Sequence, residues 1–357
     1  MYLSKLLLQN FRSYDNQLFE FDPKLNLILG PNGSGKTNIL ESISFLSSGK
    51  SFRSTGQSKL INWYQNFVSV RAKLVDNQGD ESEIEIKLIK DITSPTGSIS
   101  RKFFIQKVEK TRKKYLGVIK NVVFQPEDIR LVTGSPNRRR DFLDEIFSQT
   151  EWRYTSALSQ YHRALKHRNQ LLDQIKLNLA KPGELFYWDQ VLVKNSNIIH
   201  DFRLQFVKSV NNFFARHPDP QINVLNLNYR PSTLTEDKLK KNYSLDLQRG
   251  HTQFGPHRDD FSFDNSSFPS VDKNLAFWGS RGQQRLAVLA LRLGQINFLE
   301  ATYQDKPILL LDDIFSELDV DHQQLVVRVC RQYQTIFTSA EPESLNILNS
   351  AKLIELT

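Results

Sequence analysis

The chain has 357 residues, of which 39% are hydrophobic and 24% charged, a composition that indicates a folded globular protein and excludes a disordered one. A chain of this length exceeds what one compact core usually holds, so we expect two lobes or an elaborated single unit. The formal net charge of +8 suits a polyanionic partner without identifying one. A single cysteine, Cys330, excludes an intrachain disulfide and a zinc site built from several cysteines.

Targeting and membrane-spanning segments are not recognisable. The opening Leu6-Leu7-Leu8 is broken at once by polar residues, so it does not form the apolar core of a signal peptide. The longest apolar runs, such as residues 308–311, are far too short to cross a bilayer. We therefore expect a cytoplasmic protein with no membrane partner.

The first third of the chain alternates apolar and polar residues in short runs, a pattern that predicts strands. Expected strands cover residues 3–8, 18–21, 25–29, 67–75 and 83–90. Residues 37–46 instead have apolar side chains at helical spacing, directly after a glycine-rich segment. The local order is therefore strand, glycine loop, helix.

The middle of the chain predicts helices. Ser135-Pro136 is typical of a helix start, with serine as N-cap and proline at the first helical position. Two heptad-like stretches, 158–179 and 185–213, flank the turn Lys181-Pro182-Gly183. They predict a short antiparallel helical hairpin over about residues 152–214.

The last part returns to alternating helices and strands. We expect a helix at 283–299, a strand at 308–311, a helix near 320–332, and strands at 335–338 and 352–356. These segments and the first third would form one lobe, residues 1–130 with 275–357. Residues 131–274 would form a mainly helical second lobe.

The segment between the strand at 25–29 and the following helix fits the phosphate-binding P-loop, G-x-x-x-x-G-K-[ST]. It reads Gly30-Pro31-Asn32-Gly33-Ser34-Gly35-Lys36-Thr37. The glycines let backbone N–H groups turn around phosphates at a helix N-terminus. Lys36 would reach the β- and γ-phosphates of ATP, and Thr37 would ligate Mg²⁺. The alternative interpretation is a glycine-rich turn that arose by chance and binds nothing. The strand before it and the helix after it argue against this alternative.

A carboxylate for the magnesium shell follows the apolar strand at 308–311. Asp312 is placed to support Mg²⁺, and Asp313 is placed to orient or deprotonate the attacking water. The alternative interpretation is that both aspartates lie in a loop and are simply solvated.

A third motif, Ser280-Arg281-Gly282-Gln283, opens the helix at 283–299. It resembles the signature motif of ABC-type ATPases, which in that superfamily binds the γ-phosphate of a nucleotide held by a partner subunit. Ser280 could equally be an ordinary N-cap. Residues 316–319, Ser-Glu-Leu-Asp, match the superfamily's D-loop.

Further short motifs narrow the family. In chain order they are Asn10-Phe11-Arg12-Ser13-Tyr14, Gln125-Pro126-Glu127-Asp128, Gly134-Ser135-Pro136 with Arg138-Arg139-Arg140 and Phe142-Leu143-Asp144, and Gly255-Pro256-His257-Arg258-Asp259-Asp260. This ordered set resembles the RecF family of bacterial DNA replication and repair proteins over nearly the whole chain. Related coiled-coil ATPases share only the P-loop, the signature and the Asp-rich strand.

The resemblance implies an α/β fold. It would be an ABC-type ATPase head with mixed β-sheets around the P-loop helix, plus a mainly helical lobe with a short antiparallel hairpin. It also implies weak, DNA-stimulated ATP hydrolysis that acts as a switch. ATP would drive homodimerisation and DNA binding, and slow hydrolysis would release the DNA.

The resemblance further implies a role as a recombination mediator in DNA repair, replication restart and SOS induction, in the cytoplasm and at the nucleoid. The partners would be gapped, single-stranded or junction DNA and a RecR-like protein, with RecO in the wider pathway.

Carried over to this sequence, Gly30 to Thr37 would hold ATP with Mg²⁺, supported by Asp312, and Asp313 would act on water. Ser280, Gly282 and Gln283 would face the partner's γ-phosphate. Gln125 stands where a Q-loop residue is expected, and Arg12 would touch the nucleotide.

Three departures from the transporter pattern suit a slow switch. Gly279 precedes the signature serine where leucine is common, Asp313 stands where transporters usually carry glutamate, and Ser339-Ala340-Glu341 replaces the switch histidine. A transporter ATPase subunit and a chromosome-maintenance ATPase are the alternatives. The missing histidine argues against the first, and the short heptad runs argue against the second.

Two basic clusters are candidate DNA contacts. One comprises Lys107, Lys110, Arg112, Lys113 and Lys114, and the other Arg138 to Arg140. A charge run is usually a solvated face. The second cluster, however, lies in the first turn of the expected helix, where cations oppose the helix dipole. A phosphate backbone or an acidic partner would account for it.

Overall fold

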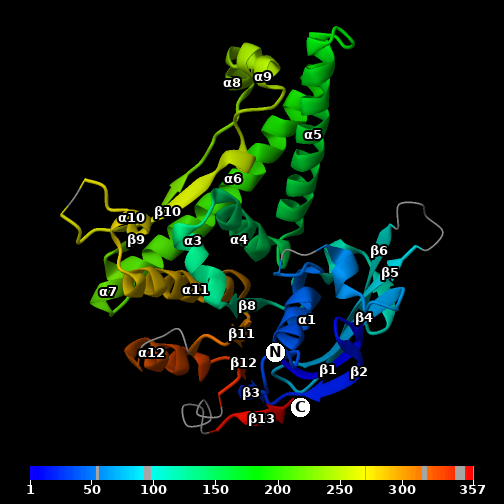
Figure 1. The fold of residues 1–357 in the computed structure, drawn as a ribbon, viewed down its shortest axis with the longest axis vertical. Coiled ribbons are helices and arrows are strands. Elements are labelled where there is room, and N and C mark those ends of the chain that lie inside the picture. The colour runs from blue at the N-terminus through cyan, green and yellow to red at the C-terminus, as the bar shows by residue number, and fades with distance from the viewer. Residues whose placement is uncertain (54–55, 92–97, 270, 316–319, 342–349, 357) are drawn as a thin grey trace. The chain divides into compact units, whose positions relative to one another are not determined.

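The computed structural model describes residues 1–53, 56–91, 98–269, 271–315, 320–341 and 350–356. Residues Met1–Asp128 and Leu299–Thr357 form one compact unit, unit 1, and residues Ile129–Phe298 form a second, unit 2. Figure 1 labels the elements of both. The α/β fold class is confirmed, because both mixed sheets and long helices are present.

The first sheet of unit 1 has five parallel strands in the order β13-β3-β12-β11-β8. Their bounds are Leu25–Leu29 for β3, Asn121–Phe124 for β8, Ile308–Asp312 for β11, Thr335–Ser339 for β12 and Lys352–Glu355 for β13. Four of them are apolar and buried, as expected for a sheet covered on both faces. Because all five run the same way, their carboxyl ends share one edge.

The second sheet of unit 1 has six antiparallel-paired strands in the order β2-β1-β4-β5-β6-β7. The strands are Tyr2–Phe11 (β1), Tyr14–Glu20 (β2), Phe67–Val75 (β4), Glu81–Lys90 (β5), Ile99–Ile105 (β6) and Val108–Lys110 (β7). From Val70 to Val75, strand β4 alternates buried and half-buried side chains, the pattern of a sheet with one face toward the core.

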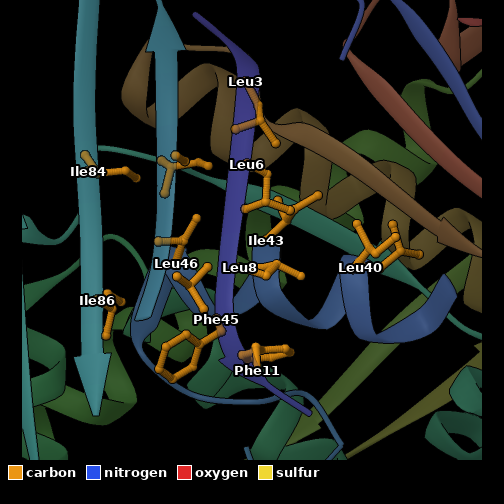
Figure 2. Packing of buried hydrophobic residues seen from close by; sticks show 14 of the residues in the cluster. Leu3, Leu6, Leu8, Phe11, Leu40, Ile43, Phe45, Leu46, Ile84 and Ile86 are labelled. Atoms are coloured by element: carbon orange, nitrogen blue, oxygen red, sulfur yellow. The ribbon is translucent and has the colours of Figure 1, made fainter. Parts of the chain in front are cut away.

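Helix α1 (Lys36–Ser48) joins the two sheets. Its apolar side chains belong to one buried cluster with residues of both sheets, such as Leu6 of β1 and Leu310 of β11. Figure 2 shows the β1 side chains directed toward Ile43 and Leu46 of the helix. The helix is thus fixed in position by packing along its whole length, and with it the loop from which it starts.

Unit 2 is built on two long helices, α5 (Trp152–Lys176) and α6 (Leu185–Arg216), which lie side by side as a hairpin (Figure 1). The other elements of unit 2 are α3 (Arg130–Thr133), α4 (Pro136–Ser148), α7 (Pro220–Asn223), α8 (Glu236–Lys241), α9 (Tyr243–Arg249), α10 (Leu275–Trp278), and the two-stranded sheet of β9 (Leu225–Arg230) and β10 (Asp260–Asn265). The remaining helices of unit 1 are α2 (Arg112–Tyr115) and α12 (Val320–Cys330).

The boundary between the lobes differs from our expectation. We placed residues 275–298 in the ATPase lobe, whereas they belong to unit 2. The reason lies in α11 (Arg281–Tyr303), whose Phe298 ring packs edge-on against Phe206 at 5.3 Å. Gly294 of α11 also approaches α6 so closely that a Cβ would lie 3.2 Å from Val210. The second half of α11, around Gly294 and Phe298, therefore packs on the long helix α6 of unit 2.

Buried charges hold unit 2 together. Arg203, which is 1% exposed, donates to Asp259 at 2.7 Å and to Asp144 at 2.7 Å. Asp259 also accepts from His200 and from the backbone N–H of Ser232. A buried ion pair of this kind is strongly destabilising to break, because the remaining charge has no solvent. The family motifs at 142–144 and 255–260 therefore meet in one structural network.

One side chain links the two sheets of unit 1. Gln334, directly before β12, accepts from the N–H of Leu3 at 2.7 Å and donates to its carbonyl at 2.7 Å. Its amide also donates to the carbonyl of Asp22 at 2.9 Å. The buried amide thus satisfies three backbone groups and fixes the position of β1 relative to the parallel sheet.

Replacing this amide tests its contribution. The Gln334→Met variant should lower the free energy of unfolding by about 2–3 kcal/mol, because three buried backbone groups lose their partner. Urea titration measures the change. The exposed neighbour Gln332, replaced in the same way, should change stability by less than about 0.5 kcal/mol. Equal stability of the two variants would mean that the sheets are held by packing alone.

Candidate nucleotide-binding site

The P-loop lies where the sequence predicted, between β3 and α1. Gly33 and Gly35 have φ angles of 88° and 99°, the left-handed region that favours glycine. A Cβ on Gly35 would lie 2.7 Å from the Tyr14 hydroxyl. Both backbone conformation and space therefore require glycine at position 35.

The loop leaves several polar groups without partners inside the protein. Gly35 is the N-cap of α1, and no side chain caps the helix. The hydroxyl of Ser34 is buried and has no hydrogen-bond partner within the described ranges. The ammonium of Lys36 bends back to the carbonyls of Gly30 and Pro31, at 2.6 and 2.9 Å. Uncapped N–H groups, an orphaned hydroxyl and a lysine are the donors that a polyphosphate would satisfy.

Asp312 meets the P-loop directly. The Thr37 hydroxyl donates to its Oδ1 at 2.9 Å, and the Thr338 hydroxyl donates to the same oxygen at 2.8 Å. Burial raises the pKa of Asp312 above the ordinary carboxyl value, partly offset by these hydrogen bonds. The two predicted metal residues are therefore adjacent, with hydroxyl and carboxylate oxygens of the kind that Mg²⁺ prefers.

Gln125 reaches the same edge of the parallel sheet. It follows β8, which pairs with β11 so that Phe124 lies opposite Leu311, one residue before Asp312. Its backbone N–H bonds Asp128 at 3.1 Å, which leaves the side-chain amide unconstrained by that bond. Gly30 follows β3 at this edge as well. The sheet thus gathers the P-loop, Asp312 and Gln125 along one line.

Asp313 has a strained backbone. Its φ is 50°, and its N–H donates to the Thr338 hydroxyl at 3.1 Å. A non-glycine residue in this region costs of order 1 kcal/mol and persists only where its surroundings enforce it. The turn directs the chain away from the strand immediately after the predicted metal carboxylate.

Arg12 is engaged with an acidic residue that the sequence reasoning missed. Its guanidinium forms two hydrogen bonds with Glu41 of α1, at 3.0 and 2.6 Å, and a third with the Lys59 carbonyl. Glu41 is fully buried and also accepts from Ser51. An acidic residue directly beside the apolar Leu40 and Ile43, on the face expected to be buried, was the available signal. The pair anchors the turn carrying Arg12 to the P-loop helix.

Two further residues near the loop were not predicted as site residues. The hydroxyl of Tyr14 lies buried beside Gly35 with no hydrogen-bond partner in the described structure, and burial raises its pKa to about 12. Arg53 donates to Asn38 of α1 at 2.9 Å, and its positive charge offsets part of the rise that burial causes in the pKa of Asp312. Tyr14 lay within a recognised motif, but only its position in the fold places its hydroxyl at the P-loop.

The signature segment begins α11 in unit 2. Ser280 and Gln283 form reciprocal bonds, Gln283 N–H to the serine hydroxyl at 3.2 Å and Ser280 N–H to the glutamine side chain at 2.9 Å. This is the geometry of a capping box. A Cβ on Gly282 would meet only the Ser280 hydroxyl, at 3.9 Å. In the isolated chain, Ser280 therefore caps the start of α11 as an ordinary N-cap residue. No contact within the described chain requires glycine at position 282. The D-loop residues 316–319 lie outside the described residues.

Comparison with known proteins identifies the family. A family model described as RecF/RecN/SMC N terminal domain matches residues 2–355. The DNA replication and repair protein RecF of Alkaliphilus oremlandii (strain OhILAs) is 32% identical, over 98% of this chain and 96% of the relative. The chain belongs to the RecF family. The protein of the same name from Leptospira interrogans is 34% identical over 97% of this chain and 93% of the relative.

Solved RecF structures share the fold. The recombination mediator protein RecF-ATPrS in the RecFOR pathway matches with a TM-score of 0.84 and 28% identity, over 100% of this chain and 96% of that one. The corresponding RecF-ATP structure has a TM-score of 0.83 and 29% identity, over 95% and 92%. An Smc head bound to the C-winged helix domain of ScpA matches over 99% and 94% at 18% identity and TM-score 0.53, which shows the head fold alone. The predicted family and the ABC-type ATPase head are confirmed.

The arginine triplet specific to the RecF-family motif set is divided by the fold. Arg139 is buried and forms a bidentate pair with Asp260, at 2.6 and 3.0 Å. Arg140 donates to the carbonyl of Asp259 at 2.7 Å, and Arg138 is exposed. The acidic partner of this arginine triplet thus lies in the same chain. Of the three arginines, only Arg138 is exposed and stays a candidate for DNA contact.

Metal and membrane features are limited in the part of the chain that the structure describes. None of its helices is long and apolar enough to span a bilayer. It contains no group of three or more His, Cys, Asp or Glu side chains that could hold a metal ion. Mg²⁺ is commonly bound through one or two protein ligands together with substrate phosphates, and the Thr37–Asp312 pair fits that donor set.

The raised pKa of Asp312 yields a prediction. A carboxyl whose folded pKa exceeds its unfolded value loses stabilisation as pH rises through that interval, so its ionised form opposes folding at neutral pH. The Asp312→Asn variant keeps the acceptor oxygen for Thr37 and Thr338. Without nucleotide, its Tm at pH 7 should equal or exceed that of the unaltered protein, while ATP turnover falls on the order of 10²-fold or more.

Asp76 supplies a control of opposite sign. Backbone N–H groups, Asp80 first and then Gln78, lower its pKa. Asp76→Asn should therefore lose stability at pH 7 and leave turnover unchanged. Thermal scans between pH 4 and 8 measure both variants. A clear fall in the Tm of Asp312→Asn at pH 7 would contradict the assignment of an unfavourable buried charge.

Proposed function

We propose that this protein is an ATP-controlled, DNA-binding recombination mediator acting in DNA repair, replication restart and SOS induction. The observation that carries the proposal is the Thr37–Asp312 hydrogen bond of 2.9 Å, made at the uncapped start of α1. It joins the two halves of a Mg-ATP site in a chain whose relatives are named DNA replication and repair protein RecF.

ATP would bind with its phosphates at the N-terminus of α1. The N–H groups of the loop and the Ser34 hydroxyl would donate to phosphate oxygens, and Lys36 would exchange its two carbonyl partners for the β- and γ-phosphates. Residues Gly30 to Thr37 form this cradle. Arg12 would act on the nucleotide through its ion pair with Glu41, by fixing α1 and the loop.

Thr37 and Asp312 would hold Mg²⁺, which when bound neutralises charge on the phosphates. Gln125, at the same strand edge, would contribute to the nucleotide site. Asp313 would orient or deprotonate the attacking water. Its carboxylate is one methylene shorter than the glutamate usual in transporters, so we infer slow hydrolysis that serves as a timing switch, stimulated weakly by DNA.

The signature segment would act on the nucleotide of a second copy. Ser280 is exposed, and the space around Gly282 is open. Because no contact in the described chain requires glycine at position 282, its small size suits the close approach of a group from another molecule. Ser280, Gly282 and Gln283 would contact the γ-phosphate across the interface of an ATP-dependent homodimer, in which the capping-box bonds rearrange.

The DNA and protein partners follow from the family. Gapped, single-stranded or junction DNA would be the substrate, and a RecR-like protein the partner, in the cytoplasm at the nucleoid. The solved relatives are titled as recombination mediators of the RecFOR pathway, which supports this placement.

Light scattering tests the nucleotide dependence of assembly. With a non-hydrolysable ATP analogue and Mg²⁺, the mass of the unaltered protein should double, whereas Lys36→Met should remain monomeric because the phosphate cation is lost. Lys24, exposed at the start of β3, supplies the matched Lys24→Met control, which should dimerise normally. Dimerisation of Lys36→Met at the same analogue concentration would refute the assigned site.

A further inference from the structure

Two arginines of unit 1 lie together, and no acidic partner for them occurs in the part of the chain that the structure describes. Arg101 of β6 and Arg112 of α2 both have a buried Nε with no hydrogen-bond partner among these residues. Burial and the charge of Arg112 lower the pKa of Arg101 to about 10, and burial lowers the pKa of Arg112. Within the described residues neither forms an ion pair, whereas the half-buried Arg12 and Arg71 of unit 1 each have a glutamate partner. We call this pair the arginine seat.

The seat lies at the C-terminus of α1. Arg112 donates through Nη2 to the carbonyl of Ser48 at 3.3 Å, the one hydrogen bond it forms in the described structure. A Cβ on Gly49, the C-cap residue with a φ of 69°, would lie 2.9 Å from Cδ and 3.2 Å from Nη1 of Arg101. Glycine at 49 therefore lets the Arg101 head lie directly against the helix end.

A capping role alone does not account for the seat. A cation at a helix C-terminus contributes about 0.3–1 kcal/mol. Taking a guanidinium out of water without a counter-ion costs several kcal/mol, and the two like charges repel each other. In addition, the Nε donor of Arg101 has no acceptor among the described residues. The balance favours an external anion that pairs with both arginines.

The surroundings favour a phosphate of a polymer. The exposed Lys113 and Lys114 follow Arg112 on α2, and the Tyr115 ring fixes this helix against Phe103 of β6 at 5.0 Å. Guanidiniums match phosphate bidentately, and flanking lysines add the diffuse charge that follows a nucleic-acid backbone. The seat is separated from Lys36 by the 13 residues of α1, or about 20 Å of helix, so it is distinct from the ATP cradle.

From this geometry we infer that Arg101 and Arg112 bind a backbone phosphate of DNA at the C-terminal end of the P-loop helix. The inference rests on the proposal that the protein binds DNA. It assigns part of the 107–114 basic cluster to that contact and adds Arg101, which lies outside the cluster. The same helix then carries a nucleotide phosphate at one end and a DNA phosphate at the other.

Fluorescence anisotropy with a labelled gapped duplex, in the presence of Mg²⁺ and a non-hydrolysable ATP analogue, tests the seat across a salt series. Arg101→Gln with Arg112→Gln should weaken binding about 5–10-fold and reduce the slope of log K against log [salt] by about 1. The control removes the same charge from exposed sites of unit 1 outside both basic clusters, as Lys24→Gln with Lys352→Gln. It should leave the slope unchanged.

A stability measurement separates a binding role from a structural one. Arg101→Met removes a desolvated charge and keeps an apolar stem, so the DNA-free variant should have an equal or higher Tm. A lower Tm together with unchanged DNA affinity would make Arg101 a structural residue and overturn the inference.

The remaining outcomes are also decisive. Failure of the unaltered protein to bind the duplex would refute the proposed function. Normal binding with identical slopes for both double variants would refute the seat alone. Competition with inorganic phosphate and with an oligoglutamate peptide identifies the anion that the seat binds. If the peptide displaces the labelled DNA at a lower concentration than unlabelled duplex does, the seat binds an acidic protein and not DNA.

Discussion

The hydrogen bond between Thr37 and Asp312 depends on the whole architecture of unit 1. It joins residues 275 positions apart, one at the start of α1 and the other at the end of β11. It can form only if the parallel sheet brings the carboxyl ends of β3 and β11 to one edge, with β12 between them. Thr338 of that intervening strand bonds the same carboxylate oxygen. Strand order is therefore what places Asp312 beside Thr37 at the end of the glycine loop.

The P-loop helix is the second constraint. It is held on both sides, by the antiparallel sheet and by the parallel sheet, within one apolar cluster. Its N-terminus lacks a cap and is available for phosphate, whereas its C-terminus carries the arginine seat. A helix packed along its length moves as a rigid body, so a shift caused at one end is felt at the other. This gives a physical route by which the nucleotide and DNA contacts could influence each other.

The motifs that are local in sequence could be predicted, and the contacts that depend on distant partners could not. The P-loop and Asp312 were recognisable because each combines a buried strand with fixed residue types at its end. Arg139 looked like a DNA contact because its partner, Asp260, lies 121 positions away. Glu41 and Arg101 were missed for the same reason, since their burial is set by neighbours from other strands.

The lobe boundary shows a related limit. Helical periodicity predicted a helix at 283–299, yet periodicity says nothing about which lobe its apolar face packs against. Phe298 and Gly294 fix that choice by their contacts with α6. The signature residues therefore belong to unit 2, whereas the P-loop belongs to unit 1.

In the proposed dimer, each ATP site is completed by a second copy of the chain. An equal mixture of two inactive variants, Asp313→Asn and Ser280→Arg, tests this arrangement. Random pairing makes half of the dimers mixed, and each mixed dimer keeps one intact site, so the mixture should regain about a quarter of the ATPase activity. A mixture as inactive as its components, with mixed dimers shown to form, would contradict a shared site. Full activity of Ser280→Arg alone would do the same.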